Sequence, residues 1–189
     1  MEQWFTLTGA IDPGVVGQTI VYLQGQLFNS ATRPISKLTF FISSLGGDID
    51  SAIRLYDYLT ALPFPVDTVG FGQIYSAGVT IYLAGQERFA LRKTKFLIHE
   101  GIYTIGQPSA PMHLHDENLT ILKELGKRNT EILSERSGKT TANIQKMMKE
   151  VKVLSADQAR SAGFVTRIID KLPIPTIPQT PTAVPPSTP

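Results

Sequence analysis

The chain has 189 residues, and its 18 lysines and arginines against 16 aspartates and glutamates leave a formal net charge of +2, which favours neither a nucleic-acid nor a membrane partner. Cysteine is absent, which excludes disulfides, thiolate nucleophiles and cysteine-bound metals and is typical of a reducing compartment. The sequence has no signal peptide and no apolar run of the roughly 20 residues that span a bilayer, so we expect a soluble, cytoplasmic protein.

The first third of the chain alternates strand and helix signals. Residues 4–7 are β-prone, apolar residues recur at helical spacing over 15–27, and residues 38–42 form a β-branched and aromatic run typical of a buried strand. A helix is predicted over 49–59 and another buried strand over 66–71. This β-helix-β order is the unit of an α/β fold.

Two glycines, Gly46 and Gly47, stand where the second strand meets the following helix. Such a pair can present backbone N–H groups near a helix N-terminus, where partial positive charge stabilises an anion or an oxyanion. A plain tight turn is the other reading, and a phosphate loop is excluded because its glycine and lysine spacings are missing.

Ser76 lies among small residues near the start of a helix predicted over 72–85. It can cap that helix through its hydroxyl, or it can be a nucleophile. The strand-turn-helix context favours the nucleophile, because such a junction exposes the hydroxyl beside backbone N–H groups that can bind an oxyanion.

The chain has three histidines, and only His99 follows a predicted buried strand, over residues 95–98. His113 and His115 lie in a polar helix predicted over 112–138, beside two carboxylates. We reject a metal site there, because side chains two positions apart on a helix point in different directions. If a Ser-His pair operates, its base is therefore His99, although a lone histidine can also be structural.

Short elements follow the long helix. Helices are predicted over 140–149 and 155–163, and strands over 151–154 and 164–169. The folded domain is expected to cover residues 1–171.

The C-terminal residues 172–189 contain seven of the 13 prolines of the chain. A segment this rich in proline cannot build a packed element. We expect it to be an extended, disordered tail.

Several segments match motifs that occur together in one protein family. Residues 44–57 resemble a motif that begins with S-P-G-G and ends with I-Y-D, with Leu45 where that motif has proline. Residues 72–79 keep the serine and two glycines of G-x-A-A-S-M-G-A, and residues 88–99 resemble R-x3-P-x4-M-I-H. The downstream segments 132–138 and 154–156 also fit. Over about residues 6–170 the chain thus resembles the proteolytic subunit of the Clp protease, whose fold is shared with crotonases.

The resemblance implies an α/β fold, a ClpP/crotonase-like spiral of β-β-α units with a protruding handle, here the helix from residue 112. It also implies a homo-oligomer, a heptameric ring that stacks in pairs, cleaving peptides or unfolded polypeptides without metal or cofactor. The family's axial-loop segment, which contacts an ATP-driven unfoldase, has no counterpart before the first strand. We therefore expect activity without that partner.

At the matching positions, the resemblance implies that Ser76 is the nucleophile and His99 the general base of an acyl transfer. The backbone N–H groups of Gly46 and Ala77 would form the oxyanion hole. The implied substrate-binding residues are Gly47, Asp48 and Gly101.

The third catalytic position departs from the family. Its aspartate falls on Val151, which cannot accept a hydrogen bond from imidazole. Glu150 is adjacent, but a shift of one residue along a strand points a side chain to the opposite face, so Glu150 serves only if the local backbone differs. The orienting group is thus Glu150, another carboxylate or a backbone carbonyl, or it is absent. A slow dyad and an inactive ring subunit both stay open, as does a crotonase-type acyl-CoA enzyme that uses the two glycines without the Ser-His pair.

Overall fold

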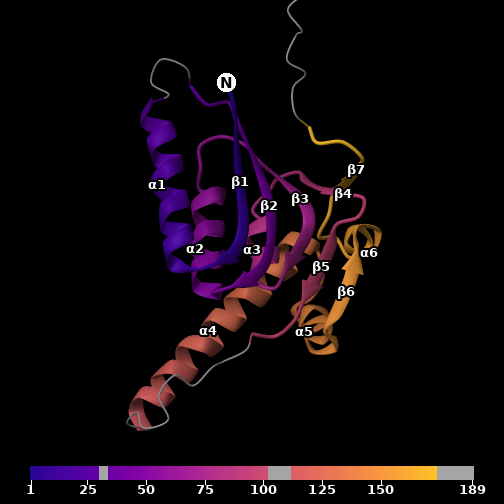
Figure 1. The fold of residues 1–189 in the computed structure, drawn as a ribbon. Helices are drawn as coiled ribbons and strands as arrows, with labels where there is room; N and C mark the ends of the chain where they lie inside the picture. The colour runs from indigo at the N-terminus through magenta and orange to yellow at the C-terminus, as the bar shows by residue number, and fades with distance from the viewer. Residues whose placement is uncertain (30–33, 102–111, 174–189) are drawn as a thin grey trace, which may run out of the picture.

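A seven-stranded sheet runs through the computed structural model, which describes residues 1–29, 34–101 and 112–173 (Figure 1). Strands and helices alternate in the first half of the chain, as predicted. The elements are β1 (Glu2–Ile11), α1 (Pro13–Asn29), β2 (Lys37–Gly47), α2 (Ile49–Thr60), β3 (Val66–Tyr75) and α3 (Ala77–Tyr82).

The second half is built from shorter elements around one long helix. They are β4 (Arg88–Leu91), β5 (Lys95–Ile98), α4 (Met112–Ser137), α5 (Thr141–Glu150), β6 (Lys152–Ser155), α6 (Ala156–Ser161) and β7 (Arg167–Ile169). Of the predicted tail, everything from residue 174 onward lies outside the described residues.

The sheet divides at β3. Strands β1, β2, β3, β4 and β7 pair in that order and are parallel throughout. The first part of β3 pairs with β4, whereas its last residues pair with β5. On its other side, β5 pairs antiparallel with β6. One edge of β3 thus carries two successive strands, and this mixed α/β arrangement confirms the predicted fold class.

Several boundaries differ from the prediction, among them the start of β1 at Glu2 and its end at Ile11. Strand β3 runs through Gly72 and reaches Tyr75, so α3 begins at Ala77 and not at residue 72. The segment looked like a helix because of its small residues, but pairing of Gln73 with Lys95 keeps it extended. Strand β2 likewise extends beyond residue 42 to Gly47, and β7 is shorter than the predicted 164–169.

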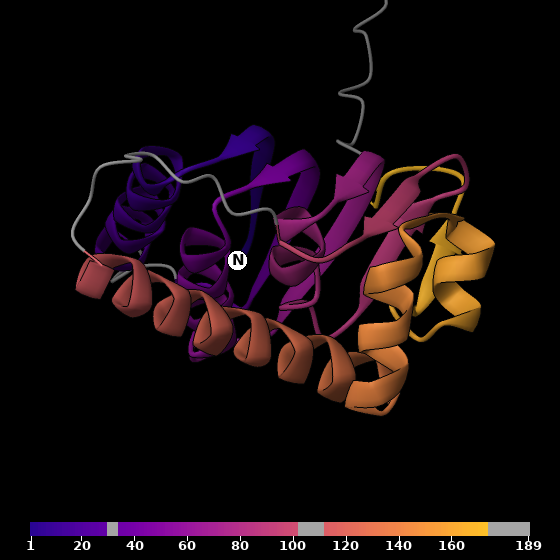
Figure 2. The same cartoon turned by 90° about the horizontal axis from the view of Figure 1, so that it is seen from below.

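Helices α1, α2 and α3 lie along one face of the sheet, and α4 crosses on their outer side (Figure 2). The core between sheet and helices is apolar, with Phe40, Ile74, Tyr82 and Phe96 fully buried. Burial of these side chains is the main favourable contribution to folding. None of the helices in the described residues is long and apolar enough to cross a membrane.

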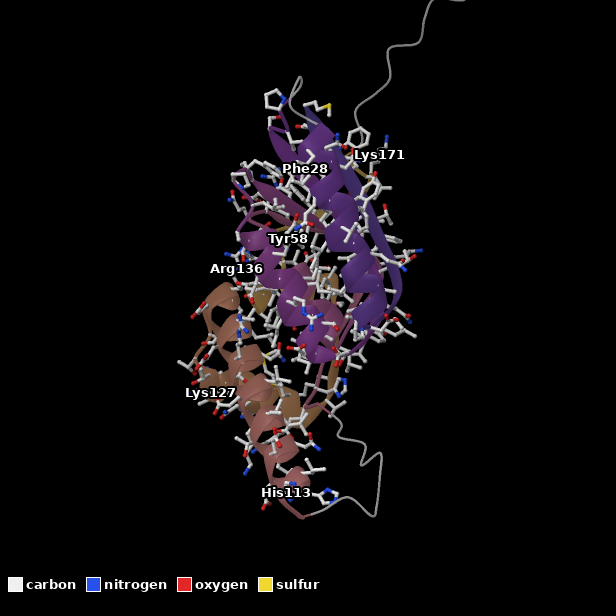
Figure 3. All side chains as sticks on the ribbon, turned by 90° about the vertical axis from the view of Figure 1, so that its left-hand side faces the viewer. Phe28, Tyr58, His113, Lys127, Arg136 and Lys171 are labelled. Atoms are coloured by element: carbon white, nitrogen blue, oxygen red, sulfur yellow. The ribbon has the colours of Figure 1, made fainter. Side chains whose placement is uncertain are left out.

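Helix α4 extends well beyond the sheet. Its 26 residues span about 39 Å at the α-helical rise. The end near Arg136 lies against the body of the protein, while His113 lies at the far tip (Figure 3). This is the protruding helix that the fold class predicted.

Two arginines fasten the base of α4. Arg88, which is 8% exposed, donates from its guanidinium to the carbonyls of Gly85, Phe164, Gly163 and Arg136 at 2.8 to 3.3 Å. The Arg136 guanidinium in turn donates to the carbonyls of Leu83, at 2.8 Å, and Gly85, which follow α3. These bonds hold α3, α4 and the turn after α6 together.

We expect Arg88→Met to lower the free energy of unfolding by about 3 kcal/mol, because it leaves several buried carbonyls without a donor. Urea denaturation checks this value. Arg54→Met is the matched control, since Arg54 pairs with Asp50 on the surface of α2 and should contribute less than about 0.5 kcal/mol. Equal losses in both variants would contradict the role given to Arg88.

Candidate active site

The ends of three parallel strands meet at one edge of the sheet. Strands β2, β3 and β5 are parallel, so their carboxyl ends bring Gly47, Ser76 and His99 to the same edge. A cleft of about 490 Å³ opens there. Its lining comprises Leu45, Gly47, Asp48, Ile49, Ser76, Ala77, Ile98, His99, Gly101, Leu122, Gly126, Asn129, Leu133 and Met148.

Ser76 occupies a strained junction between β3 and α3. Its backbone has φ 55° and ψ −126°, a positive-φ conformation that costs a non-glycine residue roughly 1–3 kcal/mol. Its N–H donates to the Leu97 carbonyl of β5 at 2.8 Å. Although Ser76 is the N-cap of α3, its side chain makes no capping bond and no hydrogen bond to another described residue. The hydroxyl therefore has no structural task in the described part of the chain.

Gly46 lies directly against this junction. A Cβ placed on Gly46 would come within 2.6 Å of the Ser76 Cβ and 2.9 Å of the Tyr75 carbonyl oxygen. Gly46 also has φ 98°, which L side chains rarely adopt. Only glycine lets the end of β2 approach the serine this closely.

The N–H of Gly46, one of the two predicted oxyanion donors, is engaged. It donates to Ser44 Oγ at 3.0 Å, and this hydroxyl donates to the Gly9 carbonyl at 2.6 Å. The other predicted donor, Ala77, is the first residue of α3, where N–H groups have no partner inside the helix. Ala77 lines the cleft next to Ser76, as does Gly47.

His99 follows β5 directly and is half-buried. Its ring lines the same cleft as Ser76, but no hydrogen bond joins the two side chains. The structure thus brings the predicted nucleophile and base into one cleft without linking them.

Asp48 and Gly101, predicted to bind substrate, line this cleft too, and the Asp48 carboxylate caps α2 by accepting from the Ser51 N–H at 2.8 Å.

Glu150, predicted as the third catalytic group, binds another partner. Its carboxylate pairs with Lys152, and this ammonium lowers the pKa of Glu150 below its ordinary value. Glu150 is absent from the cleft lining and makes no hydrogen bond to His99. In the structure it therefore does not orient the imidazole.

Val151 lies opposite His99, one residue beyond the last pair of the ladder between β5 and β6. Ile98 pairs with Lys152 in the antiparallel ladder of β5 and β6, and one step further stand His99 and Val151. Val151 ends α5 with φ 46° and ψ 63°, a left-handed conformation that is unusual for a β-branched residue. The position to which the resemblance assigns the third catalytic group is thus held by a strained, exposed valine.

Part of the lining comes from α4 and α5, which the sequence analysis did not assign to the site. Leu122, Asn129 and Leu133 contribute from α4, and Met148 contributes from α5. Asn129 could have been found from the sequence, because it is a polar residue at a helical spacing that is otherwise apolar in α4. Among the described residues no cluster of three metal-ligating side chains occurs, including around His113.

Comparison with known proteins gives two findings. The family model described as Clp protease matches residues 5–172. Among solved structures, the chain is similar to a point mutant of ClpP1 from Listeria monocytogenes, with a TM-score of 0.74 and 25% sequence identity. The match covers 89% of this chain and 91% of that one.

The backbone of Ser76 allows a test of strain at the site. We expect Ser76→Gly to be more stable than Ser76→Ala by about 1 kcal/mol, because both remove the hydroxyl but only glycine adopts this conformation without strain. Denaturant unfolding of the two variants measures the difference. If alanine proved as stable as glycine, the positive-φ backbone at this residue would carry no strain.

Proposed function

The chain belongs to the Clp protease family, and from this premise we propose that it is a serine peptidase that cleaves peptides or unfolded polypeptides through Ser76 and His99. The observation that carries the proposal is the Ser76 hydroxyl, which has no hydrogen-bond partner among the described residues and lies on a strained strand-to-helix junction in one cleft with His99. The family match over residues 5–172 favours this activity over an acyl-CoA enzyme.

The proposed reaction is an acyl transfer in two halves. Neutral His99 takes the proton of the Ser76 hydroxyl as Oγ attacks the scissile carbonyl, and then gives that proton to the leaving amine. Water, deprotonated in turn by His99, releases the acyl group and restores Ser76. No step requires a metal or a cofactor.

The developing oxyanion needs N–H donors beside Ser76. Ala77 is the proposed first donor, since its N–H adjoins the nucleophile at the start of α3. Gly46 is the proposed second donor. In that role its N–H gives up the hydrogen bond to Ser44 Oγ and donates to the oxyanion instead. Gly47, Asp48 and Gly101 are proposed to hold the peptide along the cleft.

We assign a Ser-His dyad because Glu150 pairs with Lys152 and Val151 stands level with His99. A dyad without an orienting carboxylate is slow, since weakening this group lowers kcat by about 10⁴-fold in trypsin-type enzymes. The same observations favour a second candidate function, an inactive subunit of the family. A homo-oligomeric ring with the projecting α4 as its handle is proposed for either case.

A fluorophosphonate probe separates the two candidates. We expect covalent labelling of the native protein, because the probe reacts with activated serines, and we expect Ser76→Ala to abolish it. Ser161→Ala is the matched control, since Ser161 is exposed at the end of α6, outside the cleft lining, and its loss should leave labelling unchanged. A native protein that resists the probe would favour the inactive subunit.

Restoring a carboxylate at residue 151 tests the dyad. We expect Val151→Asp to raise kcat/KM for a model peptide by about 10²-fold or more, because the new carboxylate can orient and charge-stabilise His99. Val151→Asn is the control, since asparagine also tolerates the left-handed backbone but carries no charge. Equal activities of the Asp and Asn variants would show that relief of strain, and not the carboxylate, produced the gain.

A further inference from the structure

One face of α4 forms a wall of the cleft. Leu122, Gly126, Asn129 and Leu133 line it at spacings of four, three and four residues, which places them on one side of the helix. Three of these four positions present no polar side chain. Asn129 is the exception, and the mechanism proposed above does not use it.

The amide of Asn129 is oriented by a buried threonine. Thr80 Oγ1, in a side chain with no solvent exposure, donates to Asn129 Oδ1 at 2.7 Å. With Oδ1 occupied in this way, the Nδ2 amino group is turned away from Thr80. It makes no hydrogen bond to any described residue, so a half-buried donor at the cleft wall is left without a partner.

The position of Thr80 relates this donor to the nucleophile. Thr80 comes four residues after Ser76, the N-cap of α3, so the Thr80 backbone lies about one helical turn of 5.4 Å further along this helix. Asn129, bound to Thr80, lines the same cleft as Ser76. A glutamine side chain is long enough to span one helical turn.

We propose that Asn129 determines substrate specificity by donating from Nδ2 to the side-chain carbonyl of glutamine at the residue whose carbonyl Ser76 attacks. This rests on the peptidase function proposed above. The apolar side chains of Leu122, Leu133 and Met148 contact the methylenes of that glutamine. The preferred substrate class is thus peptides with a neutral amide side chain on the N-terminal side of the scissile bond.

The charges around the cleft favour an amide over an acid. No lysine or arginine belongs to the lining among the described residues, so a substrate carboxylate would lose its hydration without a permanent cation in return. Asp48, which lines the same cleft, adds repulsion against an acidic side chain. A glutamine side chain carries no charge, so it has neither the desolvation cost of a carboxylate nor the repulsion from Asp48. Its carbonyl oxygen accepts from Asn129 Nδ2.

Two peptides that differ only in glutamine or methionine at this position test the inference, because the two side chains have similar length and volume. The measurement is the ratio of kcat/KM for the glutamine peptide to that for the methionine peptide, with the cleaved bond located by mass spectrometry. We expect Asn129→Leu to lower this ratio about tenfold, the effect of one hydrogen bond.

Asn129→Leu alone leaves the buried Thr80 hydroxyl unpaired and can destabilise the protein. The double variant Thr80→Val with Asn129→Leu removes both partners, keeps their shapes and should lower the ratio equally. Asn143→Leu, an exposed asparagine of α5 outside the cleft lining, should leave the ratio unchanged.

Different results would contradict the peptidase function and the glutamine specificity. Cleavage of both peptides with the same ratio in the native protein and in the double variant would overturn the role of Asn129 and leave the peptidase function standing. Failure to cleave either peptide, together with no fluorophosphonate labelling of Ser76, would overturn the peptidase function and the specificity with it.

Discussion

The site depends on the close approach of the β2 end to the β3–α3 junction. A single additional carbon atom on Gly46 would overlap the Ser76 Cβ, so the distance between these two backbones is set by the absence of a side chain. The parallel pairing of β2 with β3 and of β3 with β5 then determines where Ser76, after β3, and His99, after β5, lie along the edge of the sheet. The position of Ser76 relative to His99 is therefore a property of strand register.

The α4 wall of the cleft is bound to the helix that begins beside Ser76. Thr80 of α3 donates to Asn129 of α4, and seven residues further along α4 the Arg136 guanidinium donates to the carbonyls of Leu83 and Gly85, which follow α3. Helices α3 and α4 are thus joined at Thr80 and again just after the end of α3. As a result, the cleft is bounded by elements that are fastened to each other through buried polar contacts.

Local patterns predicted the fold class and most elements, because apolar periodicity of 3.6 or runs of β-branched residues are short-range signals. The extension of β3 through Gly72 was missed, since only the pairing of Gln73 with Lys95 keeps this segment extended. The placement of Ser76 after β3 and of His99 after β5 was predictable from a motif and from strand ends, while their catalytic roles stay predictions.

Contacts between side chains could not be predicted in the same way. The role of Asn129 depends on how α4 crosses α3, and the pairing of Glu150 with Lys152 depends on side-chain orientation at a turn. In the described residues, Ser76 and Val151 are also the two non-glycine residues with positive φ, at roughly 1–3 kcal/mol each. Against a typical stability of about 5–15 kcal/mol this is a large share. Selection for heat resistance alone would therefore enrich glycine at both positions, and a thermostable variant obtained in this way would lose the serine that we propose as nucleophile.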